Sequence, residues 1–336
     1  MLLYVLGALD AVAIDRVVVV VGHAAERITK KLQDEAPELV IDFVEQAVQR
    51  GTGDAVSVGL TAFDDDMEGS DSDVVVLPGD TPLLRPGTIA RLVDEHQRGD
   101  AACTILSAEL DDPTGYGRVL HERDGRVARV VEEGDATPAE RELGEINTSI
   151  YCFRRSLLAP ALRRLSPENS QGEYYLTDVV GVLHDAGYRV DAVAAADAAE
   201  TQGVNDRRQL AVAEAELRRR TNDEWLRRGV TMVDPQHTYI DAGVDIATDV
   251  TLFPGTVLQG RTVIGARAEI GPNTRLADCV IGPGATVEAT TGRDAEVGEE
   301  ARVGPYAFLR PGSAIPPEVV TGPFYTAAGP DVGEET

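Results

Sequence analysis

The feature that most constrains the fold is a six-residue repeat in the last third of the chain. After Gly229, short aliphatic residues recur at every sixth position and resume after a break: Ile240, Ile246, Leu252, Leu258, Ile264, Ile270, Leu276, then Val297, Val303, Leu309 and Ile315. A sustained hexad is typical of a parallel β-helix, in which each face of a triangular coil contributes one inward aliphatic side chain. Between Cys279 and Asp294 the pattern slips by three residues, which predicts a bulge or an excursion.

The chain before the repeat alternates between apolar runs and helical stretches. The predicted strands lie at 16–21, 39–44, 74–84, 102–107, 127–131 and from 145 onward. The predicted helices lie at 2–13, 24–35, 54–63, 86–98, 173–183 and 206–228. This alternation favours an α/β fold with a doubly wound parallel sheet. Such folds normally open with a strand and a phosphate-binding loop, so either the fold differs or its first βα unit is missing.

Composition excludes several classes of function. A net charge of −26 argues against nucleic acid as a partner, although a small anion can still bind in a pocket that holds Mg²⁺. The three cysteines, Cys103, Cys152 and Cys279, are scattered in apolar runs and indicate reduced thiols in a cytosolic protein. We find neither a signal-peptide pattern nor an apolar run long enough for a membrane span, and expect a soluble, cytoplasmic protein.

Asp80 is the first candidate for chemistry. It follows the apolar run 74–84 at its Pro-Gly break, where ligands bind beyond the carboxyl ends of parallel strands. A carboxylate there is suited to hold a hard divalent cation against a phosphate. The alternative is an ordinary strand-to-loop turn, for which Gly-Asp is common. Asn205, before the helix at 206–228, has the comparable alternative of a residue beside a helix N-cap.

Six short motifs occur in an order that resembles one enzyme family. They are Gln46-Ala-Val-Gln-Arg-Gly51-Thr52-Gly, Pro78-Gly79-Asp80-Thr-Pro, Gly115-Tyr-Gly117-Arg, Val131-Glu132, Glu145-Ile-Asn147-Thr and Gly203-Val-Asn205, accompanied by Tyr174-Tyr-Leu-Thr-Asp178. With the hexads, they resemble the bifunctional N-acetylglucosamine-1-phosphate uridyltransferase / glucosamine-1-phosphate N-acetyltransferases over residues 1–315. These enzymes make UDP-N-acetylglucosamine, a precursor of cell-wall peptidoglycan.

The resemblance implies a nucleotide site and a metal site. Gln46, Gly51 and Thr52 would bind the uracil of UTP through side-chain and backbone hydrogen bonds. Asp80 and Asn205 would be the protein ligands of the catalytic Mg²⁺, in keeping with the preference of this ion for oxygen donors. Asp80 is therefore the implied catalytic residue.

The resemblance also implies the sugar site and the reaction. Gly117, through its backbone, together with Glu132 and Asn147, would hold the ring and acetamide of N-acetylglucosamine-1-phosphate. Its phosphate oxygen would attack the α-phosphorus of UTP and release pyrophosphate, with catalysis by positioning and charge neutralisation. Glu145-Ile-Asn147-Thr and Gln46 favour the amino sugar over a glucose-1-phosphate pyrophosphorylase, which is the alternative enzyme.

In the family, the left-handed β-helix of hexapeptide repeats is an acetyl-CoA-dependent acetyltransferase and a trimerisation unit. Arg310 matches the arginine that holds the sugar phosphate in this second site, and we expect a homotrimer. The family's catalytic histidine has no match here, because His237 precedes the β-helix. We therefore expect the acetyl-transfer centre, and most of the acetyl-CoA surface, to be absent.

The family's glycine-rich triphosphate loop and its first strand also lack a counterpart in this sequence. Loss of this loop predicts a slower reaction and an unpaired gap in the sheet. We therefore predict an N-terminally incomplete uridyltransferase domain at 1–228, a C-terminally incomplete β-helix at 229–318, and a flexible tail at 319–336. A function of a different class, a non-catalytic sugar-nucleotide-binding or trimeric assembly module, is the alternative.

Overall fold

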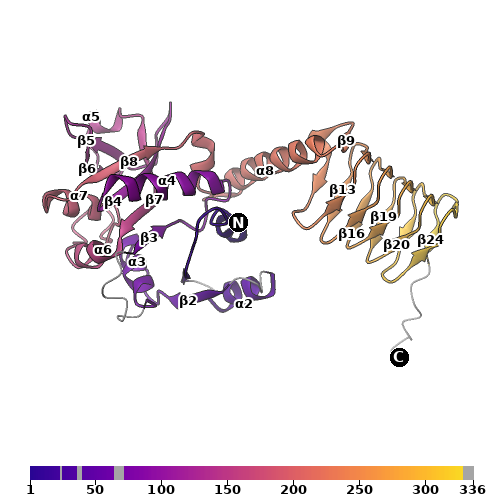
Figure 1. Cartoon of the computed structure of the whole chain (residues 1–336), viewed down its shortest axis with the longest axis horizontal. Coiled ribbons are helices and arrows are strands. Elements are labelled where there is room, and N and C mark those ends of the chain that lie inside the picture. Colours follow the sequence, from indigo (N-terminus) through magenta and orange to yellow (C-terminus); the bar gives the residue numbers. More distant parts are fainter. Residues whose placement is uncertain (23–24, 36–39, 64–71, 328–336) are drawn as a thin grey trace. The chain divides into compact units, whose positions relative to one another are not determined.

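The structure is a computed structural model that describes residues 1–22, 25–35, 40–63 and 72–327. It divides into two compact units, Met1–Leu210 and Ala211–Thr336 (Figure 1). None of the helices in these described ranges is both long enough and apolar enough to cross a membrane.

The first unit is built on a six-stranded mixed sheet with the order β6-β5-β7-β4-β8, in which β3 also pairs with β7. Its strands are β3 Asp73–Val76, β4 Cys103–Glu109, β5 Arg118–His121, β6 Val127–Val131, β7 Glu145–Arg154 and β8 Val190–Ala194. The long strand β7 runs antiparallel to β3, β4 and β5, whereas β4 and β8 are parallel. The predicted parallel sheet is therefore wrong in part, because β7 runs antiparallel to its neighbours.

Helices cover both faces of this sheet. They are α4 Pro86–Gly99 on one face and α6 Arg155–Leu162 and α7 Asp178–Asp185 on the other; the short helix α5 Pro138–Arg141 buries no residue, and the 3₁₀ helix η2 is Ala198–Thr201. Successive residues of β4 separate the two cores, with Ile105 in the cluster that contains α6 and α7 and Leu106 in the cluster that contains α4. A sheet that is buried on both faces confirms the doubly wound, Rossmann-like class.

A second, smaller sheet holds the start of the chain. It comprises β1 Val17–Val21 and β2 Ile41–Glu45, which pair in parallel, and its helices are α1 Leu2–Gly7, α2 Ala25–Glu35 and α3 Thr52–Leu60. Among the described strands, β1 and β2 pair with each other alone, and β3 pairs with β7 alone. β1 and β2 thus form a sheet of their own, separate from the six-stranded sheet. The predicted helix at 2–13 is shorter, because residues from Ala8 onward form turns.

The second unit is a parallel β-helix whose two- and three-residue strands stack into three sheets (Figure 1). The first sheet holds β9 Thr231–Met232, β12 Thr251–Leu252, β15 Glu269–Ile270, β18 Thr286–Val287 and β21 Arg302–Val303. The second holds β10 Tyr239–Ile240, β13 Val257–Gln259, β16 Arg275–Ala277, β19 Thr291–Arg293, β22 Phe308–Leu309 and β24 Thr326–Ala327. The third holds β11 Asp245–Ile246, β14 Val263–Ile264, β17 Val280–Ile281, β20 Glu296–Val297 and β23 Ala314–Ile315.

The long helix α8 spans Arg207–Arg227. The two units divide within it, after Leu210, whereas the sequence predicts the boundary after residue 228. The second half of α8 belongs to the β-helix unit because Trp225 packs in that core. The side-chain amide of Asn222 also donates to the backbone oxygens of Pro235 and Thr238 at 2.7 and 3.0 Å, beside the 3₁₀ helix η3 Pro235–His237.

The hexad positions fill the β-helix core as predicted, with Ile240 half-buried and the others buried. The predicted bulge or excursion after Leu276 is wrong. The coil continues there through three shortened steps of five residues, Leu276 to Ile281, Val287 to Gly292, and Gly292 to Val297. Three one-residue deletions therefore account for the three-residue slip, and the stack of strands is not interrupted.

The β-helix also extends beyond the predicted end at residue 318. Val320 forms a bridge with Arg302, and β24 pairs with β22 and buries Ala327. The prediction of a flexible tail is therefore wrong for residues 319–327, because their backbone is paired with the preceding coil. Residues 328–336 lie outside the described residues.

Candidate functional site

The predicted nucleotide residues lie where β2 ends and α3 begins. Gly51 is the N-cap of α3, with φ 108° and ψ 175°, and a Cβ atom there would lie 2.6 Å from the backbone oxygen of Tyr174. The backbone N–H of Gly53 donates to that oxygen at 2.8 Å, and Thr52 Oγ1 accepts from the backbone N–H of Leu176 at 3.0 Å. The close approach of two backbones explains why glycine is required at position 51.

Gln46 is held against the same loop. Its amide nitrogen donates to Asp54 Oδ2 at 2.8 Å and to the backbone oxygen of Gly51 at 3.3 Å. The loop from Gln46 to Gly53 is thus fixed both within itself and against residues 174–176. This second contact shortens the predicted helix at 173–183, which begins at Asp178.

The predicted sugar residues lie together across β5, β6 and β7. The Thr177 hydroxyl donates to Glu132 Oε1 at 3.0 Å, and Glu132 Oε2 would lie 3.4 Å from a Cβ atom on Gly117. The backbone N–H of Asn147 donates to the backbone oxygen of Gly117 at 2.8 Å, and Asn147 is buried. The three predicted residues are therefore brought together, with Thr177 as an additional member.

Burial sets the electrostatics of this group. Desolvation raises the pKa of Glu132 above its ordinary value, and the charges of Asp178 and Asp135 add to the effect. Desolvation followed by the charge of Asp135 likewise raises the pKa of Asp178. A carboxyl group with a raised pKa can more readily donate a hydrogen bond to a neutral polar group, such as a sugar hydroxyl.

The buried side chain of Arg118 supports the neighbouring backbone. Its guanidinium pairs with Glu133 Oε2 at 2.9 Å and donates to the backbone oxygens of Tyr116 and Arg141. The segment that carries Gly117 is therefore fixed on both sides by polar contacts. Sequence analysis assigned no role to Arg118.

The predicted metal ligands come from two loops that touch. Asp80 follows β3, is half-buried, and its backbone oxygen accepts from the backbone N–H of Val204 at 2.9 Å. A Cβ atom on Gly203 would lie 3.5 Å from Asp80 Oδ2. Asn205 is the next residue after Val204 and is exposed. The structure thus places Asp80 beside the backbone that leads into Asn205.

The N-terminus of α8 holds Asn205 in place. Gln209 Oε1 accepts from the backbone N–H groups of Asn205 and Asp206 at 2.6 and 3.1 Å, and Asp206 Oδ1 accepts from the backbone N–H of Gln209 at 2.7 Å. This reciprocal arrangement is a capping box with Asp206 as the cap. Asn205 is thus the neighbour of the helix cap, and it is exposed.

Contacts between neighbouring residues connect these groups into one site. Residues 174–177 contact Thr52 and Glu132, and Glu132 lies beside Gly117. Burial, followed by the charge of Asp80, raises the pKa of the Tyr116 hydroxyl. Tyr116 and Thr177 were missed by sequence reasoning, although both lie inside the motifs that carried the resemblance.

A different cluster has the composition of a metal site. Asp73, His96 and Cys152 place ligand atoms within 4.8 Å of one another, the one such group of three in the parts of the chain that the structure describes. His96 Nε2 lies 3.3 Å from Asp73 Oδ1, and Nδ1 lies 2.9 Å from the Thr104 hydroxyl. Both ring nitrogens of His96 are therefore engaged, and burial raises the pKa of the Cys152 thiol, so that the thiolate needed for metal binding is disfavoured. We interpret this cluster as a structural contact that joins α4 to the sheet.

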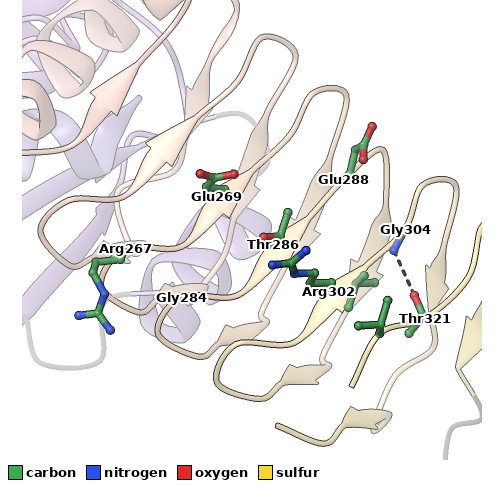
Figure 2. A pocket seen from close by; sticks show the side chains of 10 residues that line it. Arg267, Glu269, Gly284, Thr286, Glu288, Arg302, Gly304 and Thr321 are labelled. Carbon is green, nitrogen blue, oxygen red and sulfur yellow. Dashed lines mark hydrogen bonds between the residues drawn. The ribbon is translucent and has the colours of Figure 1, made fainter. Parts of the chain in front are cut away.

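The remaining predicted residue, Arg310, lies in the β-helix unit. It is exposed and follows β22, where its backbone oxygen accepts from the backbone N–H of Ser313 at 3.0 Å. A hollow on another face of the β-helix is shown in Figure 2, where Arg302 and Thr286 lie side by side. Residues of both charge signs line it, including Arg267, Glu269, Glu288 and Arg302. It contains none of the predicted site residues.

A doubly wound sheet with an aspartate beyond β3, followed along the chain by a β-helix, is the architecture expected of a nucleotidyl transferase. Residues 1–225 match the family model described as nucleotidyl transferase. Relatives named bifunctional protein GlmU are 44% identical in Corynebacterium efficiens (94% of this chain, 65% of the relative), 42% in Desulfitobacterium hafniense (99% and 71%) and 44% in Mycobacterium tuberculosis (100% and 68%). The chain belongs to the GlmU family of nucleotidyl transferases. It spans about two-thirds of the length of these relatives.

Proposed function

We propose that the first unit transfers a uridylyl group from UTP to N-acetylglucosamine-1-phosphate, forming UDP-N-acetylglucosamine and pyrophosphate in the cytoplasm. The observation that carries this proposal is the continuous set of contacts from Gly51 and Thr52, through residues 174–177, to Glu132 and Gly117. The residues expected to bind nucleotide and sugar thus lie in one site. The GlmU family membership supports the choice of substrates.

The residues near Asp80 fit a Mg²⁺ ion. Asp80 offers a half-buried carboxylate and Asn205 an amide oxygen, and the Val204 to Asp80 hydrogen bond at 2.9 Å holds their loops together. Hard oxygen donors of this kind suit Mg²⁺, which uses few protein ligands and completes its shell with water and phosphate. When bound, the ion would neutralise charge on the phosphates.

The protein residues bind and orient the substrates. Gln46, Gly51 and Thr52 would hold the uracil, while Asn147 and the backbone of Gly117 would hold the acetamide. Glu132 would hydrogen-bond the sugar hydroxyls, whose O–H groups can donate to its carboxylate oxygens. The enzyme contributes position and charge rather than a general base, as is usual in transfer to phosphorus.

For the β-helix we propose assembly into a homotrimer. Val263 and Val280 are directly paired on one outward face and are 40% and 48% exposed, which favours a protein contact there. Arg310 would bind the phosphate of a glucosamine-1-phosphate in the second, acetyl-CoA-dependent site of the family. Light scattering at low and high salt tests the assembly, and a monomer at all protein concentrations would contradict it.

The test of the main proposal is release of pyrophosphate from UTP, N-acetylglucosamine-1-phosphate and Mg²⁺ by the purified chain. Asp80→Ala should lower the rate about a hundredfold or more, because it removes a charged group at the phosphates. Asp245→Ala, at an exposed position of the β-helix unit, should leave the rate unchanged. Glucose-1-phosphate in place of the amino sugar tests the alternative substrate.

If UDP-N-acetylglucosamine stabilises the chain against heat but no pyrophosphate is released, the chain is a binding module and the enzymatic proposal is wrong. A ligand that binds only the folded state raises the melting temperature, and the stabilisation grows with the logarithm of ligand concentration over Kd. The two functions are therefore separated by two measurements on the same preparation.

A further inference from the structure

The first unit contains a buried carboxylate that no part of the proposed reaction uses. Glu200, in η2, is 2% exposed. Its Oε2 accepts from the Thr88 hydroxyl at 2.6 Å, and its Oε1 pairs with Arg85 Nε at 3.1 Å. A glutamate is almost never fully buried unless it is paired in this way. The position of η2 against the start of α4 is therefore set by charged contacts.

Glu200 and its partner Arg85 each lie close in sequence to a predicted metal ligand. Arg85 lies five residues after Asp80 and is the N-cap of α4, and Glu200 lies five residues before Asn205. Arg85 also contacts Asp197 at 3.4 Å, in the same loop as Glu200. One loop therefore leads from the ion pair to Asp80, and the other leads from it to Asn205.

A backbone contact closes the arrangement near the metal ligands. The backbone N–H of Val204 donates to the backbone oxygen of Asp80 at 2.9 Å. The two loops are thus joined at both ends, by Glu200 with Arg85 and Thr88 at one end and by Val204 with Asp80 at the other. Neither loop can slide past the other without breaking a contact of the buried Glu200 carboxylate or the backbone hydrogen bond between Val204 and Asp80.

We propose that Glu200 is a positioning residue that sets the spacing between Asp80 and Asn205, and so the affinity of the metal site. This inference rests on the proposed function, because it takes these two residues as the metal ligands. Mg²⁺ and Mn²⁺ demand a narrow range of ligand distances, so a small displacement of one loop lowers affinity. Residues that orient metal ligands typically change metal affinity by about 10- to 100-fold when they are replaced.

The other end of α4 offers a matched control. Asp73 Oδ1 lies 3.3 Å from Nε2 of the buried His96, and burial lowers the pKa of that ring, so Asp73→Asn weakens a hydrogen bond between the same helix and the sheet. Asp73 begins β3, at the opposite end of that strand from Asp80. A general loosening of α4 would therefore affect the Glu200 and Asp73 variants alike, whereas a positioning role would affect Glu200 variants alone.

The experiment measures the affinity of the full chain for Mn²⁺ in the presence of UTP by electron paramagnetic resonance. Glu200→Gln is expected to weaken binding by about tenfold or more. Asp73→Asn is expected to leave it unchanged. Thr88→Val should weaken binding, and Thr88→Ser, which keeps the hydroxyl, should restore it; this pair replaces Glu200→Gln if that variant fails to fold.

Hydrogen exchange at the Val204 amide provides a second measurement. Faster exchange is expected in Glu200→Gln and not in Asp73→Asn, because the Val204 to Asp80 bond depends on the adjacent ion pair. If Asp80→Ala leaves Mn²⁺ affinity unchanged, the proposed metal site is wrong and the inference falls with it. If Asp80→Ala abolishes binding while Glu200→Gln and Thr88→Val do not alter it, the proposed function stands and the inference about Glu200 is overturned.

Discussion

The two units obtain their cores from interactions over very different distances along the sequence. In the β-helix, Leu258 pairs with Leu276, so each strand finds its partner one coil away. In the first unit, Val75 pairs with Cys152 across most of the domain. A local repeat can therefore be recognised from periodicity alone, whereas the pairing of β3 with β7 leaves no periodic mark in the sequence.

The units also differ in which polar groups they bury. The β-helix buries threonines at its corners, such as Thr256 and Thr290, whose hydroxyls donate to nearby backbone oxygens at 2.7 Å. The first unit buries Arg118, Glu200 and Asn147. Buried charge is costly unless it is paired, so its concentration in the first unit indicates where geometry is under functional constraint. The following experiments test this contrast.

The largest expected effect is on the β-helix core. Leu258→Ala should lower the free energy of unfolding of this unit by about 2–5 kcal/mol, because a fully buried leucine leaves a cavity. Trp225, the one tryptophan of the chain, packs in that core, so its fluorescence during urea unfolding reports this unit. Val257→Ala, on the outward side of the same strand, is the control and should have a small effect. A loss seen instead by probes of the first unit would break the division between the two cores.

The next effect is at the close contact of the first unit. Gly51→Ala should destabilise that unit by about 2 kcal/mol or more, because its backbone conformation disfavours a side chain and a Cβ would lie 2.6 Å from Tyr174. Gly87→Ala, in α4 with open space around it, should instead stabilise by about 0.4–1 kcal/mol. Hydrogen exchange of the first unit measures both, and equal effects would refute the steric reason.

A smaller effect is expected where the β-helix coil is shortened. Gly292→Leu restores an aliphatic residue at an inward position, yet it should destabilise by about 1–2 kcal/mol through overpacking. A Cβ there already lies 3.1 Å from Leu276 and 3.4 Å from both Cys279 and Leu309. Urea unfolding followed by Trp225 measures the change, and a stabilised variant would show that the core at this coil is loose.

The smallest effect concerns pH and has opposite signs in the two units. Burial raises the pKa of Glu132, so its contribution to stability is present below its ordinary value of 4.5 and is lost as pH rises through the raised pKa. Hydrogen bonds from Arg219 and Arg220 lower the pKa of Glu216 to about 2. Its contribution to stability is therefore present above pH 4.5 and is lost as pH falls from 4.5 towards about 2.

Glu132→Gln should therefore become more stable relative to the parent chain as pH rises above 4.5, and Glu216→Gln should become less stable relative to the parent chain as pH rises from about 2 to 4.5. Each difference is expected to stay below about 1 kcal/mol, because water screens partly exposed pairs. Thermal unfolding at a series of pH values measures both variants. Differences of the same sign would show that the two carboxylates have similar environments.

Most helices and strands, and the order of the site motifs, could be predicted from the sequence. The contacts between these elements could not. The hexads from Leu252 to Leu276 predicted the β-helix because each position faces one core. The mixed sheet was missed, since strand direction in β7 depends on distant partners. Glu200 was missed because an isolated glutamate in a loop has no pattern, and its burial arises only when η2 meets α4.

The shortened steps around Gly292 have a consequence for how such a repeat can be recognised. Three steps that are one residue short, between Leu276 and Val297, leave every strand there paired, so the coil accommodates differences in length that would shift a conventional sheet out of alignment. Each corner acts as a site where length can vary, while the strands keep their partners. A strict six-residue search will therefore undercount the coils of a β-helix whose corners differ in length.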